Sequence, residues 1–134
     1  MRIGRPRRSV GRVYHVAIAD DWEASLSFGS YEAATRGIPY SADEPIRAVL
    51  PERLQAMLDD RYHDLTLPLL VIVLSLDALT AAGIPVDLDP ITGGVRIRGP
   101  LPPWDDTVVH AVIPLDRVDG RWLAPATQTL EDEE

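Results

Sequence analysis

Two arginines and two aspartates are the side chains with the clearest chemistry. Arg96 and Arg98 are two positions apart in an expected strand and therefore share one of its faces. Such a pair predicts either a clamp for a phosphate or carboxylate, or pairing with the nearby acids Asp87 and Asp89. A carboxylate beside such a clamp can accept a hydrogen bond from a sugar hydroxyl, or stabilise positive charge at an anomeric carbon. The alternative is that the two aspartates form a surface pair.

His15 is a polar residue in an apolar segment that we expect to form the first strand, on the face opposite Tyr14 and Val16. A ligand-binding histidine and a buried structural histidine both fit this position. His63, at an expected helix end, and His110, in an expected strand, are interpreted as structural. Nothing in the spacing of the three histidines predicts a metal site.

The sequence lacks the common catalytic motifs. It has no glycine-rich phosphate loop after a strand, no H-E-x-x-H, no G-x-S-x-G and no EF-hand loop. Standard nucleotide hydrolases, zinc peptidases and α/β-hydrolases are therefore poor interpretations. The absence of cysteine also excludes a thiol nucleophile, a thiolate metal site and a disulfide framework.

The elements that must position these side chains begin with a strand over residues 13–19. Asp20 and Glu23 fit a capping box for a helix that Gly29 ends. Ser41 and Glu44 fit a second capping box, which predicts helical turns as far as about residue 50.

The second half of the chain predicts mostly strands. Pro51 suits the first position of a helix over residues 51–62, and residues 69–76 (LLVIVLSL) predict a central strand covered on both faces. Shorter strands are expected at residues 84–88, 94–98, 107–114 and 121–124. An order of strand, helices and then strands is typical of an α+β fold rather than an alternating parallel sheet.

Length and charge predict one domain with charged ends. We expect a flexible basic arm over residues 1–12, a single domain over residues 13–125 and an acidic tail over residues 126–134. Residues 13–134 hold all 21 acids, so the body repels phosphate backbones and argues against nucleic acid as a partner. The longest apolar run is shorter than the ~20 residues of a membrane helix. We expect a cytoplasmic protein without a membrane partner, in which the arm and tail are candidate sites for a protein partner.

Six segments carry a resemblance to a known family. They are VYHVAIADDWEASLSFGSY (13–31), GIPYSADEP (37–45), LLVIVLSLDAL (69–79), PVDLDP (85–90), VRIRGPLP (95–102) and VVHAVIPL (108–115). Their order and spacing resemble the bacterial family named domain of unknown function 952, whose members look like small relatives of the ADP-ribosyltransferase fold. The resemblance implies an α+β fold with an ADP-ribosyltransferase-like split antiparallel sheet flanked by short helices.

The resemblance also implies a site. In the wider ADP-ribosyltransferase group, a His, Tyr, Glu trio holds NAD: the histidine contacts ribose, the tyrosine stacks on nicotinamide, and the glutamate supports the ribosyl cation. By position, His15, Tyr40 and Asp89 correspond to this trio. Tyr40 stands where the family usually has a second histidine, and Asp89 where it usually has a glutamate.

The remaining residues implied to bind the ligand are Ser41, Arg96 and Arg98. The two arginines replace a histidine and the tyrosine of the family's Tyr-Gly-Pro-Leu signature. The resemblance thus implies a divergent ADP-ribosyl or phosphoribosyl transferase, acting on NAD or another nucleotide at a ribosyl centre. Two alternatives remain open: a non-catalytic protein that binds another small anion in the same cleft, and a protein-interaction module.

Overall fold

The structure is a computed structural model that describes residues 11–33, 41 and 44–125. Tyr40, the tail over residues 126–134 and all of the arm except Gly11 and Arg12 lie outside the described residues. Arg12 belongs to the first strand. The predicted flexibility of the arm and the role of the tail therefore stay predictions.

Six of the described strands form one antiparallel sheet in the order β4-β5-β2-β1-β3-β6. These strands are β1 (Arg12–Ile18), β2 (Ile46–Val49), β3 (Leu69–Ser75), β4 (Val86–Leu88), β5 (Gly94–Ile97) and β6 (Val109–Pro114). A separate antiparallel hairpin follows, made of β7 (Asp116–Val118) and β8 (Arg121–Leu123).

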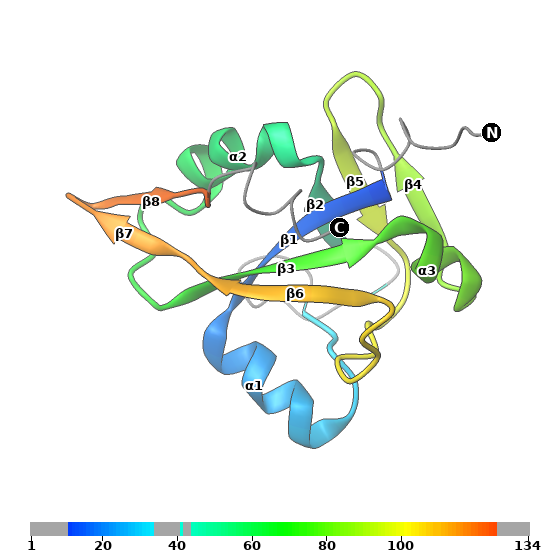
Figure 1. The fold of residues 1–134 in the computed structure, drawn as a ribbon. Coiled ribbons are helices and arrows are strands. Elements are labelled where there is room, and N and C mark those ends of the chain that lie inside the picture. Colours follow the sequence, from blue (N-terminus) through cyan, green and yellow to red (C-terminus); the bar gives the residue numbers. More distant parts are fainter. Residues whose placement is uncertain (1–10, 34–40, 42–43, 126–134) are drawn as a thin grey trace.

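Each face of the sheet has its own apolar layer, and α1 and α2 lie on opposite sides of the sheet (Figure 1). On one face, which we call the α1 face, α1 (Ala19–Phe28) contributes Trp22 and the short helix α3 (Leu76–Ala81) contributes Leu79. On the other, the α2 face, the core includes side chains of α2 (Leu54–Arg61) and the β8 residue Trp122. A 3₁₀ turn, η2 (Pro51–Arg53), leads into α2.

Strand periodicity assigns each side chain of β1 to one of these faces. Val13 and Ala17 belong to the core on the α1 face, whereas Tyr14 and Val16 belong to the core on the α2 face. His15 alternates with the first pair and is opposite Ile72 of β3 in the register. The imidazole therefore belongs to the α1 face.

The junction between β1 and β2 is short. β1 pairs with β3 along all seven of its residues, from Arg12 opposite Ser75 to Ile18 opposite Leu69. Its register with β2 consists of Tyr14 opposite Val49. The sheet thus consists of two three-stranded halves, β4-β5-β2 and β1-β3-β6, joined at one narrow point.

The structure confirms the α+β class, with a mostly antiparallel sheet and a few short helices. The apolar run predicted as a central strand is β3. Its buried side chains belong alternately to the two cores, one on each face of the sheet. Ser75 ends this strand and caps α3, an element that the sequence did not predict, by accepting a hydrogen bond from the amide of Ala78.

One predicted helix is absent, and another lacks its predicted cap. Helical turns were expected from Ser41 to residue 50, but Ile46–Val49 in this range form the strand β2. The amide of Glu44 donates to the backbone oxygen and to Oγ of Ser41, but Pro45 disfavours helical backbone at the residue before it. The helix predicted from Asp20 is present as α1, which begins at Ala19, but it has no side-chain cap, so the predicted capping box is absent. Its end at Gly29 is as predicted, in the left-handed conformation with φ of 95°.

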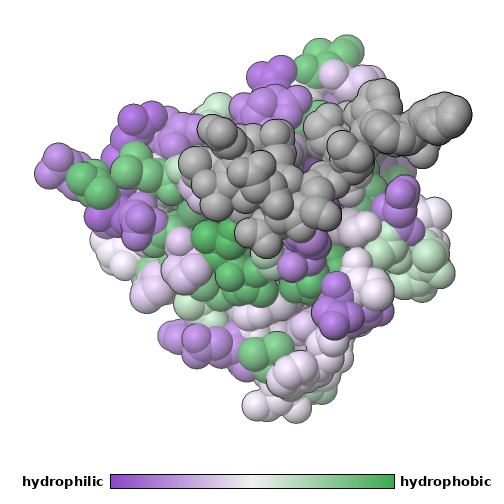
Figure 2. Space-filling view, in the orientation of Figure 1, coloured by the Kyte–Doolittle hydropathy of each residue, from purple (hydrophilic) through white to green (hydrophobic). Residues whose placement is uncertain are grey.

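At one edge of the sheet, β6 exposes apolar residues to solvent. Val112 is 41% exposed, whereas Ile72, its register partner on β3, is fully buried. Figure 2 shows an apolar area in the middle of the view, over β3 and β6. None of the helices within the described ranges has the length and apolar character needed to cross a membrane.

Candidate functional site

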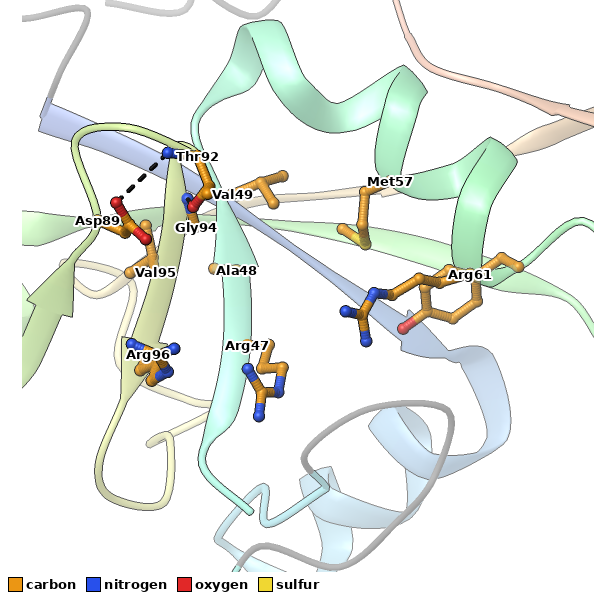
Figure 3. A pocket seen from close by; sticks show the side chains of 11 residues that line it. Arg47, Ala48, Val49, Met57, Arg61, Asp89, Thr92, Gly94, Val95 and Arg96 are labelled. Carbon is orange, nitrogen blue, oxygen red and sulfur yellow. Dashed lines mark hydrogen bonds between the residues drawn. The ribbon is translucent and has the colours of Figure 1, made fainter. Parts of the chain in front are cut away.

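A pocket of about 300 Å³ lies on the α2 face, between α2, β2 and the β4–β5 hairpin (Figure 3). Arginines from three elements line it: Arg47 of β2, Arg61 of α2 and Arg96 of β5. Val49, Met57 and Tyr62 line it with side chains that pack on the α2 face. Ala48 and Val95 border it with their backbone, because their side chains belong to the core on the α1 face. We call it the arginine pocket.

Strand register places two of these arginines side by side. Arg47 is directly opposite Arg96 in the antiparallel pairing of β2 with β5. Their strand neighbours Ala48 and Val95 belong to the core on the α1 face, so both arginines point to the α2 face. Among the described residues, neither guanidinium forms an ion pair or hydrogen bond. Like charges opposite each other destabilise a sheet, and an anion between them relieves that repulsion.

Asp89 lies at the other end of the pocket, in the turn between β4 and β5 (Figure 3). Its Oδ1 accepts a hydrogen bond from the amide of Ile91 at 2.9 Å and a longer one from Thr92. These hydrogen bonds lower the pKa of Asp89, and the positive charge of Arg96 adds to the effect. The carboxylate is therefore ionised at neutral pH.

Arg98 does not complete the clamp predicted with Arg96. Its Nε donates to Oδ2 of Asp87 at 2.6 Å, and it is not among the residues that line the arginine pocket. This is the pairing that the sequence left open as the alternative. The neighbour of Arg96 in the pocket is instead Arg47, which comes from a strand that was predicted to be helical.

His15 is enclosed in the α1 face, where it is 1% exposed. Its Nδ1 lies 2.7 Å from the backbone oxygen of Arg47, and its Nε2 lies 2.8 Å from the hydroxyl of Tyr31. A carbonyl only accepts, so Nδ1 carries the proton and Nε2 accepts from Tyr31. The imidazole thus supplies the bond to the Arg47 carbonyl where the register between β1 and β2 ends.

The environment of His15 holds it neutral. Burial lowers its pKa from 6.5 to about 4, although the hydrogen bond to the Arg47 carbonyl acts in the opposite direction. Burial also raises the pKa of Tyr31, whose ring meets the imidazole edge-on at 5.3 Å between centroids. The Trp22 ring lies 5.0 Å from that of Tyr31. This is a satisfied, buried polar group, as the structural interpretation of His15 requires.

His15 and Asp89, two members of the predicted trio, are therefore not brought together as expected. His15 lies on the α1 face, whereas Asp89 lines a pocket on the α2 face, and the sheet separates them. The physical reason is strand alternation: His15 shares its face with Val13 and Ala17. Tyr40 is outside the described residues. Ser41 is exposed and is not among the residues that line the pocket.

The sequence interpretation missed Arg47 and Arg61. Arg61 follows Met57 by one helical turn, so the spacing within the predicted helix already placed both on one side of α2. For Arg47, the signal was the alternation of Ile46 and Ala48, which marks a strand with Arg47 on its opposite face.

A wider and shallower hollow of about 610 Å³ lies along α1. Its charged lining residues are the acids Asp21 and Glu32, and the Tyr31 ring forms part of its wall. An open hollow with this lining offers no cation to an anionic ligand. The arginine pocket is the better candidate site.

No protein-family model and no curated protein matches the sequence. Two solved structures have a similar fold: the crystal structures of protein CC0527 from Caulobacter crescentus and of its double methionine mutant. The TM-score is 0.64 in both cases, the alignment covers 84% of this chain and 93% of that chain, and the sequences are 17% and 16% identical. At this identity the likeness shows the fold alone.

Proposed function

We propose that this protein binds a small anion in the arginine pocket. The observation that carries the proposal is the register pair of Arg47 and Arg96, two unpaired guanidinium groups within the described structure that face one hollow. Planar guanidinium groups bind the oxygens of phosphates and carboxylates in bidentate geometry. Arg61 of α2 also lines the pocket, and its Nε lies 3.8 Å from Oδ2 of the neighbouring Asp60.

Binding is better supported than ribosyl transfer. The transfer chemistry implied by the resemblance needs the histidine and the acid on the same ligand, but the imidazole of His15 is enclosed on the other face of the sheet. Both of its nitrogens already have hydrogen-bond partners. A volume of about 300 Å³ is also at the lower end of small-molecule pockets and favours a ligand smaller than a whole dinucleotide.

The test is calorimetric titration with pyrophosphate, AMP, ADP-ribose, NAD and a short-chain carboxylate. We expect at least one of these anions to bind, and Arg47→Gln and Arg96→Gln each to weaken that binding about tenfold, because each removes charge-assisted hydrogen bonds. Arg121→Gln is the matched control: it makes the same change in charge at an exposed residue paired with Asp59. Absence of heat with every anion, or an equal loss in the control, would contradict the proposal.

A further inference from the structure

The arginine pocket has opposite charges at its two ends. Figure 3 shows Arg47 and Arg96 toward one end of the two strands, and Asp89 with Thr92 toward the other. The amide of Asp89 donates to the Gly94 oxygen, so Asp89 extends the β4–β5 pairing two positions beyond Arg96. At a rise of about 3.4 Å per residue, the backbone positions of Arg96 and Asp89 are offset by about 7 Å along the strands.

The negative end is fixed and stays charged. Oδ1 of Asp89 is held by the amides of Ile91 and Thr92, which orients the carboxylate without neutralising it. The charge of Arg96 acts on Asp89 from a distance, and the two residues form no ion pair. The carboxylate therefore does not cancel the charge of the arginine end.

Apolar side chains also line the pocket. Val49 lines the pocket from β2 and Met57 lines it from α2, and both side chains pack with the core on the α2 face. These residues offer hydrocarbon surface to a ligand and provide no side-chain hydrogen bonds. A ligand that fits all three parts has an anionic group, a short hydrocarbon segment and a hydrogen-bond donor.

We infer that the ligand is a small zwitterion, with a carboxylate or phosphate on Arg47 and Arg96 and an ammonium group on Asp89. The inference rests on the proposed anion binding and names the chemical class of ligand for that site. An ammonium group is favoured over a hydroxyl because a charge-assisted hydrogen bond to a carboxylate is about twice as strong as a neutral one.

The probes are 6-aminohexanoate, whose extended chain separates its charges by about 7 Å, the backbone offset along the strands, and hexanoate, which lacks the amine. We expect 6-aminohexanoate to bind the intact protein about tenfold more tightly than hexanoate. Asp89→Asn should remove that difference and leave hexanoate binding equal or stronger, because a negative charge is lost. Asparagine keeps the oxygen that accepts from Ile91 and Thr92, so the turn is preserved.

Asp105→Asn is the matched control. Oδ1 of Asp105 likewise accepts backbone amides, from Thr107 and Val108, and Asp105 does not line the pocket. This variant should keep the tenfold preference. Equal affinity for the two probes, or a preference that survives Asp89→Asn, would overturn the inference and leave anion binding intact. If neither hexanoate nor 6-aminohexanoate nor any anion of the earlier titration binds, the proposed function itself fails.

Discussion

Polar side chains on the two faces of the sheet differ in their hydrogen-bond partners. On the α1 face, His15 is enclosed and both of its ring nitrogens are hydrogen-bonded. On the α2 face, Arg47 and Arg96 reach a hollow, and no described side chain pairs with their guanidinium groups. A buried polar group needs its partners inside the protein, whereas a polar group at a hollow can take them from a ligand.

Arg47 belongs to both regions. Its backbone oxygen accepts the hydrogen bond from His15, and its side chain lines the pocket on the other face. On the α1 face, the histidine thus holds β2 against β1. On the α2 face, the arginine of the same strand extends into the pocket. We therefore expect substitutions of His15 to change stability and substitutions of Arg47 to change anion binding.

The largest expected effect is on stability, from His15→Ala. The substitution leaves a cavity and removes the partners of the Arg47 carbonyl and the Tyr31 hydroxyl, so we expect a loss of about 3 kcal/mol in the free energy of unfolding. Urea denaturation measures it. Arg96→Gln, on the exposed side of β5, should change stability by less than about 0.5 kcal/mol. A loss below about 1 kcal/mol for His15→Ala would contradict the assignment of the histidine to stability.

The second effect is the pH dependence of stability. The pKa of His15 is about 4 in the folded protein, against 6.5 when unfolded, because burial penalises the charged ring. Between pH 4 and pH 6.5 the unfolded chain binds more protons than the folded protein does. The contribution of neutral His15 to stability is therefore complete above pH 6.5 and is lost as the pH falls toward 4. From pH 7 to pH 5 we expect the free energy of unfolding to fall by about 2 kcal/mol on this account.

Urea denaturation at pH 7 and pH 5 tests this with His15→Gln as the matched variant. Glutamine does not titrate, and its amide can donate to the Arg47 carbonyl and accept from Tyr31. His63 and His110 are common to both proteins, so the difference between the two pH dependences isolates His15. The same pH dependence in both proteins would show that the imidazole is not held neutral by burial.

The fold class could be predicted from the sequence because its signals are local. The β-branched run of β3 and the Gly29 helix end depend on neighbouring residues alone. β2 could not be predicted in the same way, because four residues carry a weak alternation and the preceding Ser41 and Glu44 imitate a helix cap. Its strand conformation is stabilised by pairing with β5, a contact between residues about fifty positions apart.

The candidate site depended on that missing strand. Asp89 and Arg96 were predicted, and both line the pocket. Their partner Arg47 could not be predicted while β2 was expected to be helical, since only the β2–β5 register places it beside Arg96. The location of His15 on one strand face was predicted correctly, but the side of the sheet that holds the pocket depends on where α2 packs, and single-strand periodicity does not contain that information.

The smallest expected effect tests which arginine lies beside Arg96 in the site: Arg47, as the structure shows, or Arg98, as the sequence predicted. Arg98 and Asp87 form an exposed ion pair beside the pocket, and such pairs contribute little to stability. Removing Arg98 alone would free Asp87, which is opposite Arg96 and would compete with the anion. The double variant Asp87→Asn with Arg98→Gln removes both charges and should leave anion affinity within about twofold and stability within about 0.5 kcal/mol. A tenfold loss of affinity in this double variant, equal to that of Arg47→Gln, would show that Arg98 contributes to binding. The predicted clamp of Arg96 and Arg98 on one strand would then be supported.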